Sequence, residues 1–212
     1  MPQTMASGKA VRHTERQIRE LTPLPRSFYS RSTLDVARDL LGSFLVHQTS
    51  RHFLVGRIVE VEAYIGEDDP ACHASHGLTP RTEVMYGPPG HAYIYFTYGM
   101  HHLLNAVTEP RGCPAAVLIR GVEPLVGIEH MRRRRGPRPD RQLTNGPAKL
   151  CAAFDIDLKL NRNDLTRPPL YITKPVEPLG ESIRWTPRIG IRHGRKRRWR
   201  CLLDHNPFVS RG

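Results

Sequence analysis

Hydrophobic and polar residues alternate most regularly over residues 54–65. Glu60, Glu62 and Tyr64 occupy every second position of this segment. The positions beside them are apolar, namely Val59, Val61, Ala63 and Ile65. A two-residue period is typical of a strand, because neighbouring side chains of a strand point to opposite faces. The pattern therefore predicts a strand with one apolar face and one face that carries two carboxylates and an aromatic ring.

Four shorter apolar runs predict further strands, over residues 44–47, 91–98, 100–107 and 115–122. The second and third runs flank Gly99, so we expect a β-hairpin with its tip at this glycine. Residues 66–90, between the long strand and the hairpin, are punctuated by glycine and proline and predict a long loop. Loops of this length in compact domains are usually functional or disordered.

Three short helices are expected. The first runs from Ser32 to Gly42. Ser32 is an N-cap residue that forms a capping box with Asp35, and Gly42 favours the end of the helix. The second covers residues 124–133, because a proline at its start suits the first helical turn. The third begins at Pro147 for the same reason.

Residues 1–27 are polar, basic and without periodicity, which predicts a flexible N-terminal arm before a single domain over residues 28–212. The 19 prolines and 17 glycines imply many turns and argue against a helical bundle. No apolar run approaches the length of a membrane span, and the N-terminus lacks the apolar region of a signal peptide. We therefore expect a soluble intracellular protein.

The net charge is +12, from 32 Lys and Arg residues against 20 Asp and Glu residues. A surplus of this size favours a nucleic-acid partner, because neutralising phosphates releases counterions. Ribosomal, membrane-surface and heparin-binding proteins share this property. The cysteines are far apart without a C-x-x-C pair, which argues against a zinc ribbon and a disulfide scaffold and indicates reduced thiols: Cys72, Cys113, Cys151 and Cys201.

Two charged residues on predicted strands are candidates for chemistry. Arg120 follows an apolar run over residues 117–119. A buried guanidinium needs an anionic partner, which a nearby Glu or a substrate phosphate would supply. The alternative for Glu62 is a carboxylate on a solvated face of the sheet.

Four aromatic side chains lie within six positions of the expected hairpin, namely Tyr93, Tyr95, Phe96 and Tyr98. Aromatic rings near basic residues suit base stacking, and the alternative is an ordinary half-buried strand. Tyr98 directly precedes Gly99. A ring at an exposed hairpin tip is well positioned to enter a stack of bases as a wedge.

Metal and lysine chemistry have weaker support. The chain has 11 histidines, but no H-E-x-x-H motif and no Cys/His pair at ligand spacing, so no metal site is expected. Lys149 is a candidate Schiff-base nucleophile. The alternative is a surface lysine near a DNA phosphate.

In their order along the chain, several of these segments resemble the alkyladenine (3-methyladenine) DNA glycosylase family. The resemblance covers about residues 33–210 and rests on residues 57–64, 69–73, 93–100, 105, 117–120 and 145–150. It implies a mixed α/β (α+β) fold, a single compact domain with a curved, mostly antiparallel sheet, surrounding helices and a protruding hairpin that intercalates into DNA. It also implies a monofunctional enzyme that hydrolyses the N-glycosidic bond of flipped, damaged purines and thereby initiates base excision repair.

The resemblance also implies roles for individual residues. Glu62 matches the general base and Arg120 its partner at the catalytic water. Tyr98 matches the intercalating wedge. The base pocket matches four residues, Tyr64, His73, Tyr95 and Asn105. No metal and no organic cofactor are implied, and the expected partner is double-stranded DNA with alkylated or deaminated purines, bound by a monomer.

This chain departs from better-known members over residues 74–90, at His101 and His102, and in a basic tail over residues 195–200. These differences leave the ranking of lesions open. Two rival functions are a non-enzymatic nucleic-acid-binding module and a metal-dependent nuclease. The expected location is the cytoplasm of a bacterium, or the nucleus if the source is eukaryotic.

Overall fold

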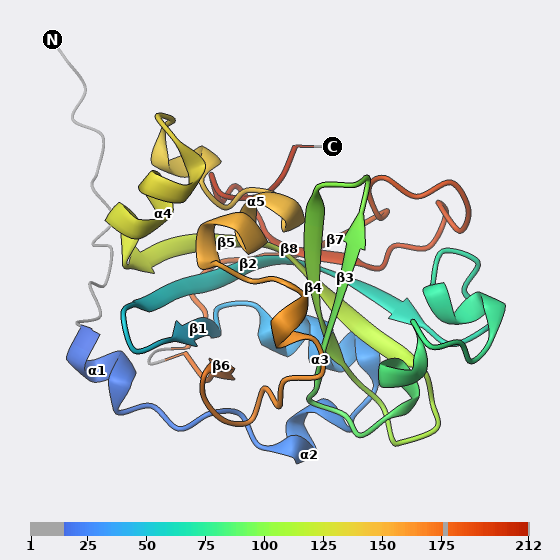
Figure 1. Ribbon diagram of the computed structural model, residues 1–212. Helices are drawn as coiled ribbons and strands as arrows, with labels where there is room; N and C mark the ends of the chain where they lie inside the picture. Colours follow the sequence, from blue (N-terminus) through green and yellow to red (C-terminus); the bar gives the residue numbers. More distant parts are fainter. Residues whose placement is uncertain (1–14, 176–177, 212) are drawn as a thin grey trace, which may run out of the picture.

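The computed structural model describes residues 15–175 and 178–211. Within them, eight antiparallel strands form one sheet in the order β3-β4-β5-β2-β1-β6, with β8 beside β2 and β7 beside β8 (Figure 1). The strands are β1 (Phe44–Gln48), β2 (Phe53–Ile65), β3 (Ala92–Thr97), β4 (His101–Val107), β5 (Ala115–Val126), β6 (Leu170–Thr173), β7 (Ile183–Thr186) and β8 (Arg200–Leu203). The helices are α1 (Glu15–Arg19), α2 (Arg26–Tyr29), α3 (Thr33–Leu40), α4 (Ile128–Arg135) and α5 (Pro147–Phe154), with short 3₁₀ turns η1 (His73–His76), η2 (Glu83–Tyr86), η3 (Asp140–Gln142) and η4 (Leu158–Leu160).

Strand β2 lies at the centre of the sheet and carries both carboxylates. It pairs with β5 along one edge, and with β1 and then β8 along the other. Figure 1 shows α5 in front of the sheet and α3 behind it. Glu60 and Glu62 are fully buried. The polar face of β2 is part of the interior, and the solvated alternative for Glu62 is wrong.

The expected hairpin is confirmed as β3 and β4, which pair from Ala92 opposite Ala106 to Thr97 opposite His101. Gly99 has φ +68° at the tip, in the left-handed region that favours glycine. Figure 1 shows the hairpin projecting beyond the sheet. The mixed α+β class is confirmed with it.

The expected helix over residues 124–133 begins later than predicted. Pro124 lies in β5 opposite Gly56, where a register shift interrupts the ladder. A proline has no N–H to donate, and such an irregularity accommodates it. Gly127, with φ +78°, then ends the strand, and α4 starts at Ile128. The helix from Pro147 is confirmed as α5.

Helix α3 is confirmed, but its expected cap is wrong. Ser32 makes no capping hydrogen bond with its side chain. The carboxylate of Glu109 accepts instead from the backbone N–H of Thr33 (2.6 Å) and from its hydroxyl (2.7 Å). An acidic group at a helix N-terminus also favours the helix dipole. Glu109, which lies 76 positions from Thr33 in the chain, therefore caps this helix in place of Ser32.

The N-terminal arm expected over residues 1–27 falls partly outside the described residues, which begin at residue 15. Residues 15–27 pack against the domain rather than extending from it. Ile18 and Leu24 are buried, and the backbone N–H of Leu24 donates to the carbonyl of Ile172 (2.7 Å). For residues 1–14 the arm stays a prediction.

Residues 66–90 contain two 3₁₀ turns, and buried side chains anchor the segment to the sheet. All four cysteines are free, and all except Cys113 are buried. No helix among the described residues has the length and apolar character needed to cross a membrane.

Candidate active site

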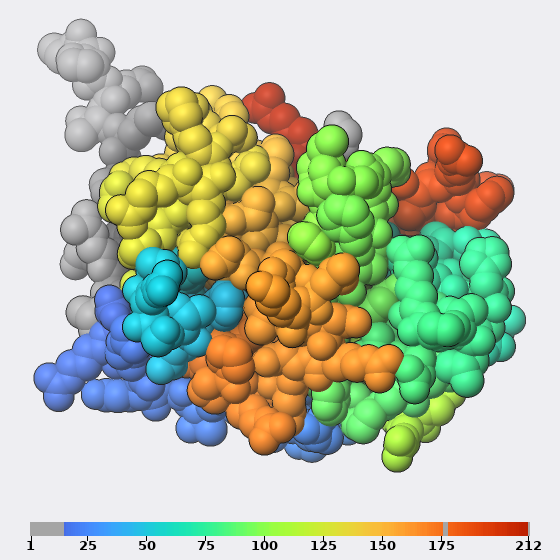
Figure 2. Space-filling model, in the orientation of Figure 1, coloured from blue at the N-terminus to red at the C-terminus, as the bar shows by residue number. Residues whose placement is uncertain are grey.

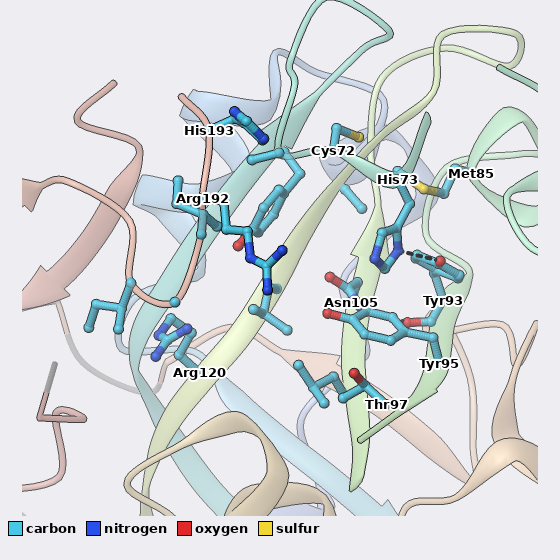
Figure 3. Close-up of a pocket in the computed structure, with 18 of the residues that line it drawn as sticks. Cys72, His73, Met85, Tyr93, Tyr95, Thr97, Asn105, Arg120, Arg192 and His193 are labelled. Carbon is cyan, nitrogen blue, oxygen red and sulfur yellow. Dashed lines mark hydrogen bonds between the residues drawn. The ribbon is translucent and has the colours of Figure 1, made fainter. Parts of the chain in front are cut away.

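A cavity of about 430 Å³ opens between the hairpin, residues 70–73 and the segment 189–193 (Figure 3). The hairpin and these two segments meet on the right-hand side of the surface in Figure 2. Five of the seven residues expected at the site contribute to the pocket wall or floor, namely Tyr64, His73, Tyr95, Asn105 and Arg120, and Tyr98 stands at its mouth. The remaining residue, Glu62, is fully buried.

The Glu62 carboxylate lies directly behind the pocket. Its Oε1 accepts from the backbone N–H of Ile189 (2.7 Å). Its Oε2 accepts from the hydroxyl of Tyr64 (2.8 Å) and from Nη1 of Arg120 (3.2 Å). All three donors belong to residues that line the pocket. The carboxylate is thus separated from the cavity by its own hydrogen-bond donors.

Arg120 has the anionic partners that its position in an apolar strand predicts. Its Nε donates to Glu60 (3.0 Å) and its Nη1 donates to Glu62, and the residue is 8% exposed. Burial lowers the pKa of this guanidinium, but Glu62 and Glu60 together raise it above its ordinary value. Arg120 is therefore a fixed cation between two carboxylates.

Sequence reasoning missed the role of Glu60. Its carboxylate also accepts from Arg200 (2.6 Å) and from the backbone N–H and hydroxyl of Ser210 (2.6 and 2.7 Å). The alternating pattern put Glu60 on the same face as Glu62, which is a signal for a shared cation. Its partners near the end of the chain have no local signal.

A second buried ion pair was also missed. Arg188 donates to Asp69 through Nη1 (2.5 Å) and Nη2 (2.7 Å), and both side chains are fully buried. Burial raises the pKa of Asp69, but hydrogen bonds from Arg188 bring it below its ordinary value. Arg188 precedes Ile189, so this pair holds the N–H donor of Ile189 against Glu62. Arg188 therefore has a structural role.

Aromatic rings form one wall of the pocket. Nδ1 of His73 lies 2.7 Å from the hydroxyl of Tyr93, and its ring packs edge-on against Tyr95 with centroids 4.6 Å apart. Burial, the charge of Arg81 and His76 lower the pKa of His73 to about 4. The imidazole is consequently neutral at neutral pH. Tyr93, which supports His73, was not assigned to the pocket from the sequence.

Asn105 lies in the pocket wall, and Tyr98 lies at the hairpin tip. Asn105 is 4% exposed, lines the pocket and donates from Nδ2 to the carbonyl of Tyr93 (3.0 Å). Tyr98 is 85% exposed at the hairpin tip, with Met100 (70%) beside it. The hairpin tip therefore presents two large side chains to solvent.

The other candidate residues are not brought into the pocket. Lys149 does not line it, and its Nζ donates to Oδ1 of Asn145 (3.0 Å). Among the described residues, no group of three or more His, Cys, Asp and Glu side chains has a metal-binding arrangement. The absence of a metal stays a prediction.

Comparison with known proteins identifies the relatives of this chain. The model of a family described as methylpurine-DNA glycosylase matches residues 27–207. A protein of Carboxydothermus hydrogenoformans is 52% identical over 189 residues, which cover 89% of this chain and 98% of that protein. A protein of Methanocella arvoryzae is 48% identical over 193 residues, which cover 89% and 96%. Both carry the provisional name 3-methyladenine DNA glycosylase.

Proposed function

Because this chain belongs to the methylpurine-DNA glycosylase family and is a DNA N-glycosylase, we propose that it flips alkylated or deaminated purines out of duplex DNA and hydrolyses their N-glycosidic bond. The observation that carries the proposal is the Glu62 carboxylate, which three pocket-lining residues hold behind a cavity of about 430 Å³. The partner is DNA, and the family excludes the rival reading of a non-enzymatic binding module.

Base flipping is the first step. A base inside a duplex is out of reach of a hydrolase, so glycosylases extrude it into a pocket. Tyr98 and the hairpin would fill the vacated space, and Tyr64, His73 and Tyr95 would surround the flipped purine. A cavity of about 430 Å³ falls within the range of small-molecule sites.

Glu62 is proposed as the general base. A carboxylate offers about four lone-pair sites, and three of them accept from Ile189, Tyr64 and Arg120. The proposal assigns the fourth site to the attacking water, which reaches the carboxylate between these three donors. Glu62 takes a proton from this water while the water oxygen bonds to the anomeric carbon. The glycosidic bond breaks, and its electron pair leaves with the base.

The negative charge of Glu62 also stabilises the oxocarbenium-like transition state. Arg120 positions the carboxylate and the water. A cationic alkylated purine leaves without further help, whereas a neutral base must be protonated on leaving. His73 is neutral near pH 7 and is proposed as a wall of the pocket rather than that acid.

We further propose that the enzyme is monofunctional, works as a monomer and needs no cofactor. Lys149, the residue considered for a lyase step, is outside the pocket. The relatives come from bacteria and an archaeon, which supports a cytoplasmic, DNA-associated enzyme.

The proposal is tested on methylated duplex DNA, with unmethylated duplex of the same sequence as the control. The enzyme should release purines and leave intact abasic sites, so that strands break only after treatment with alkali. Direct strand breaks that disappear with EDTA would instead indicate a metal-dependent nuclease. Borohydride trapping of an enzyme–DNA adduct would contradict the monofunctional mechanism.

A further inference from the structure

Arg192 extends into the pocket without a charge partner. Figure 3 shows its guanidinium reaching from the segment 189–193 into the middle of the pocket, between Arg120 and the aromatic wall. The side chain is exposed and forms no ion pair with a carboxylate in the described part of the chain. Arg120 differs, because Glu60 and Glu62 neutralise it.

Arg81 adds a second unpaired charge beside the aromatic wall, although it does not itself line the cavity. It donates from Nη2 to Nε2 of His73 (3.4 Å), and its guanidinium lies 5.1 Å from the ring centroid of Tyr95. A guanidinium has no acceptor, so Nε2 is the acceptor and Nδ1 carries the proton that it donates to Tyr93. No ion pair between Arg81 and a described carboxylate occurs.

These two charges give the pocket an electrostatic preference. A purine that alkylation has made cationic would be repelled by Arg192 inside the cavity and, more weakly, by Arg81 beside His73 and Tyr95. A neutral purine with a carbonyl oxygen would instead accept a hydrogen bond from a guanidinium. We propose that Arg192 is a specificity-determining residue that favours neutral, acceptor-bearing damaged purines over cationic ones. This inference rests on the proposed function.

The aromatic wall acts in the opposite direction, since electron-rich rings attract cations. Arg81 already lies close to the Tyr95 ring and weakens the attraction of that ring for a cationic base. Arg192 extends into the cavity itself, so its effect on a bound base is the more direct one. Without the Arg192 charge, the aromatic rings should therefore determine whether the pocket prefers a cationic or a neutral base.

The test compares R192Q with wild type on two duplexes of identical sequence, one with hypoxanthine and one with 7-methylguanine. Hypoxanthine is neutral and carries a carbonyl oxygen, whereas 7-methylguanine is cationic. Base release is measured in single turnover with enzyme below saturation. R192K is the matched control, because it keeps the charge and most of the length. Arg192 is exposed and makes no hydrogen bond within the described chain, so R192Q should fold as wild type does.

We expect R192Q to raise the rate for 7-methylguanine relative to hypoxanthine on the order of tenfold, and R192K to leave this ratio near that of wild type. A change of both rates by the same factor would overturn the inference, because it would mean that Arg192 contacts the DNA backbone. An unchanged or falling ratio would overturn it as well. If wild type releases neither base, the proposed function itself fails and the inference falls with it.

R81Q provides an independent check from a charge outside the cavity lining. It should move the ratio in the same direction, and R81Q combined with R192Q should move it further. R81Q should also raise the pKa of His73, because it removes one of the charges that hold that pKa down. The imidazole signals in an NMR titration report this change without any turnover. A His73 pKa that stays the same in R81Q would contradict an effect of the Arg81 charge on the aromatic wall.

Discussion

The floor of the pocket and the tip of the hairpin follow opposite rules. At the floor, Glu62 and Arg120 are buried and joined by hydrogen bonds of 2.7 to 3.2 Å with their neighbours. At the tip, Tyr98 and Met100 are large, mostly exposed side chains. A buried charge is tolerated only with partners that fix it, whereas an exposed ring becomes useful when a ligand covers it. The floor therefore suits the proposed chemistry, and the tip suits the proposed contact with DNA.

Glu62→Gln tests the floor most directly and should have the largest effect. The substitution keeps the shape but removes the base and the charge, so single-turnover excision should fall on the order of 10²–10⁴-fold or more. Affinity for lesion DNA should stay the same or rise, because a negative charge near phosphates is lost. E60Q is the matched comparison, since Glu60 shares Arg120 but its other partners, Arg200 and Ser210, do not line the pocket. Near-normal excision by E62Q would contradict the assignment.

Asp69→Asn breaks the buried pair that supports the floor. Arg188 would keep its charge without a full partner, which destabilises a protein by about 3–5 kcal/mol. The free energy of unfolding in urea measures the loss. D140N is the control, because Asp140 and Arg132 form an ion pair whose side chains are both more than 40% exposed. Surface pairs contribute about 0–1 kcal/mol. Equal losses in both variants would mean that burial of the Asp69 pair does not matter.

His73 predicts a pH dependence of stability. Its folded pKa of about 4 lies below the ordinary value of 6.5, so the unfolded chain binds the proton more tightly. Neutral His73 therefore contributes to the free energy of unfolding above pH 6.5. This contribution is lost as the pH falls toward 4, by at most about 3 kcal/mol. Unfolding free energies of wild type and H73Q at pH 7 and pH 4 check it. The loss between these pH values should be smaller in H73Q.

Tyr98→Ala tests the tip. Stacking against a base contributes about 1–3 kcal/mol, so lesion binding should weaken by that amount while bound, flipped substrate is still hydrolysed. Binding of lesion duplex, followed by fluorescence anisotropy, measures this change. F96A is the comparison, because Phe96 is also exposed on β3 but packs against His102. If F96A and Y98A weaken binding equally, the tip has no special role.

Asn105→Ala should have the smallest effect, on selectivity rather than on rate. The amide donates to the carbonyl of Tyr93 through Nδ2, which leaves Oδ1 toward the pocket. Loss of a polar group that discriminates between exocyclic substituents should raise activity on guanine-type bases relative to adenine-type lesions. A panel of lesion duplexes measures the ratio. An unchanged ratio would remove Asn105 from base recognition.

Local patterns predicted the parts of the site that lie within one strand or hairpin. The two-residue period identified β2 and the shared face of Glu60 and Glu62. The position of Arg120 after an apolar run predicted that a buried anion lies beside it. Gly99 marked the hairpin tip. Each of these signals acts between neighbours in the chain, where sterics and side-chain alternation determine the outcome.

The rest depends on contacts between distant segments. Arg188 pairs with Asp69 across 119 positions, and Ile189 donates to Glu62 across 127. Nothing in local periodicity specifies such partners. Pro124 shows the same limit. A proline at this position favours the start of a helix, but the pairing of β5 with β2 places it in a strand. The cap of α3 moved from Ser32 to Glu109 for a similar reason.

The pairing of Glu60 with Ser210 has a consequence for how the enzyme is made. A ribosome releases the chain from its N-terminus, and Ser210 follows Glu60 by 150 positions. Arg188, Ile189 and Arg200 also emerge late. Until then, β2 can pair with β1 and β5 while its carboxylates still lack several of their donors. We therefore expect a chain truncated before residue 188 to leave the proposed catalytic floor incomplete, because Glu60 and Glu62 would lack their donors from Ile189, Arg200 and Ser210.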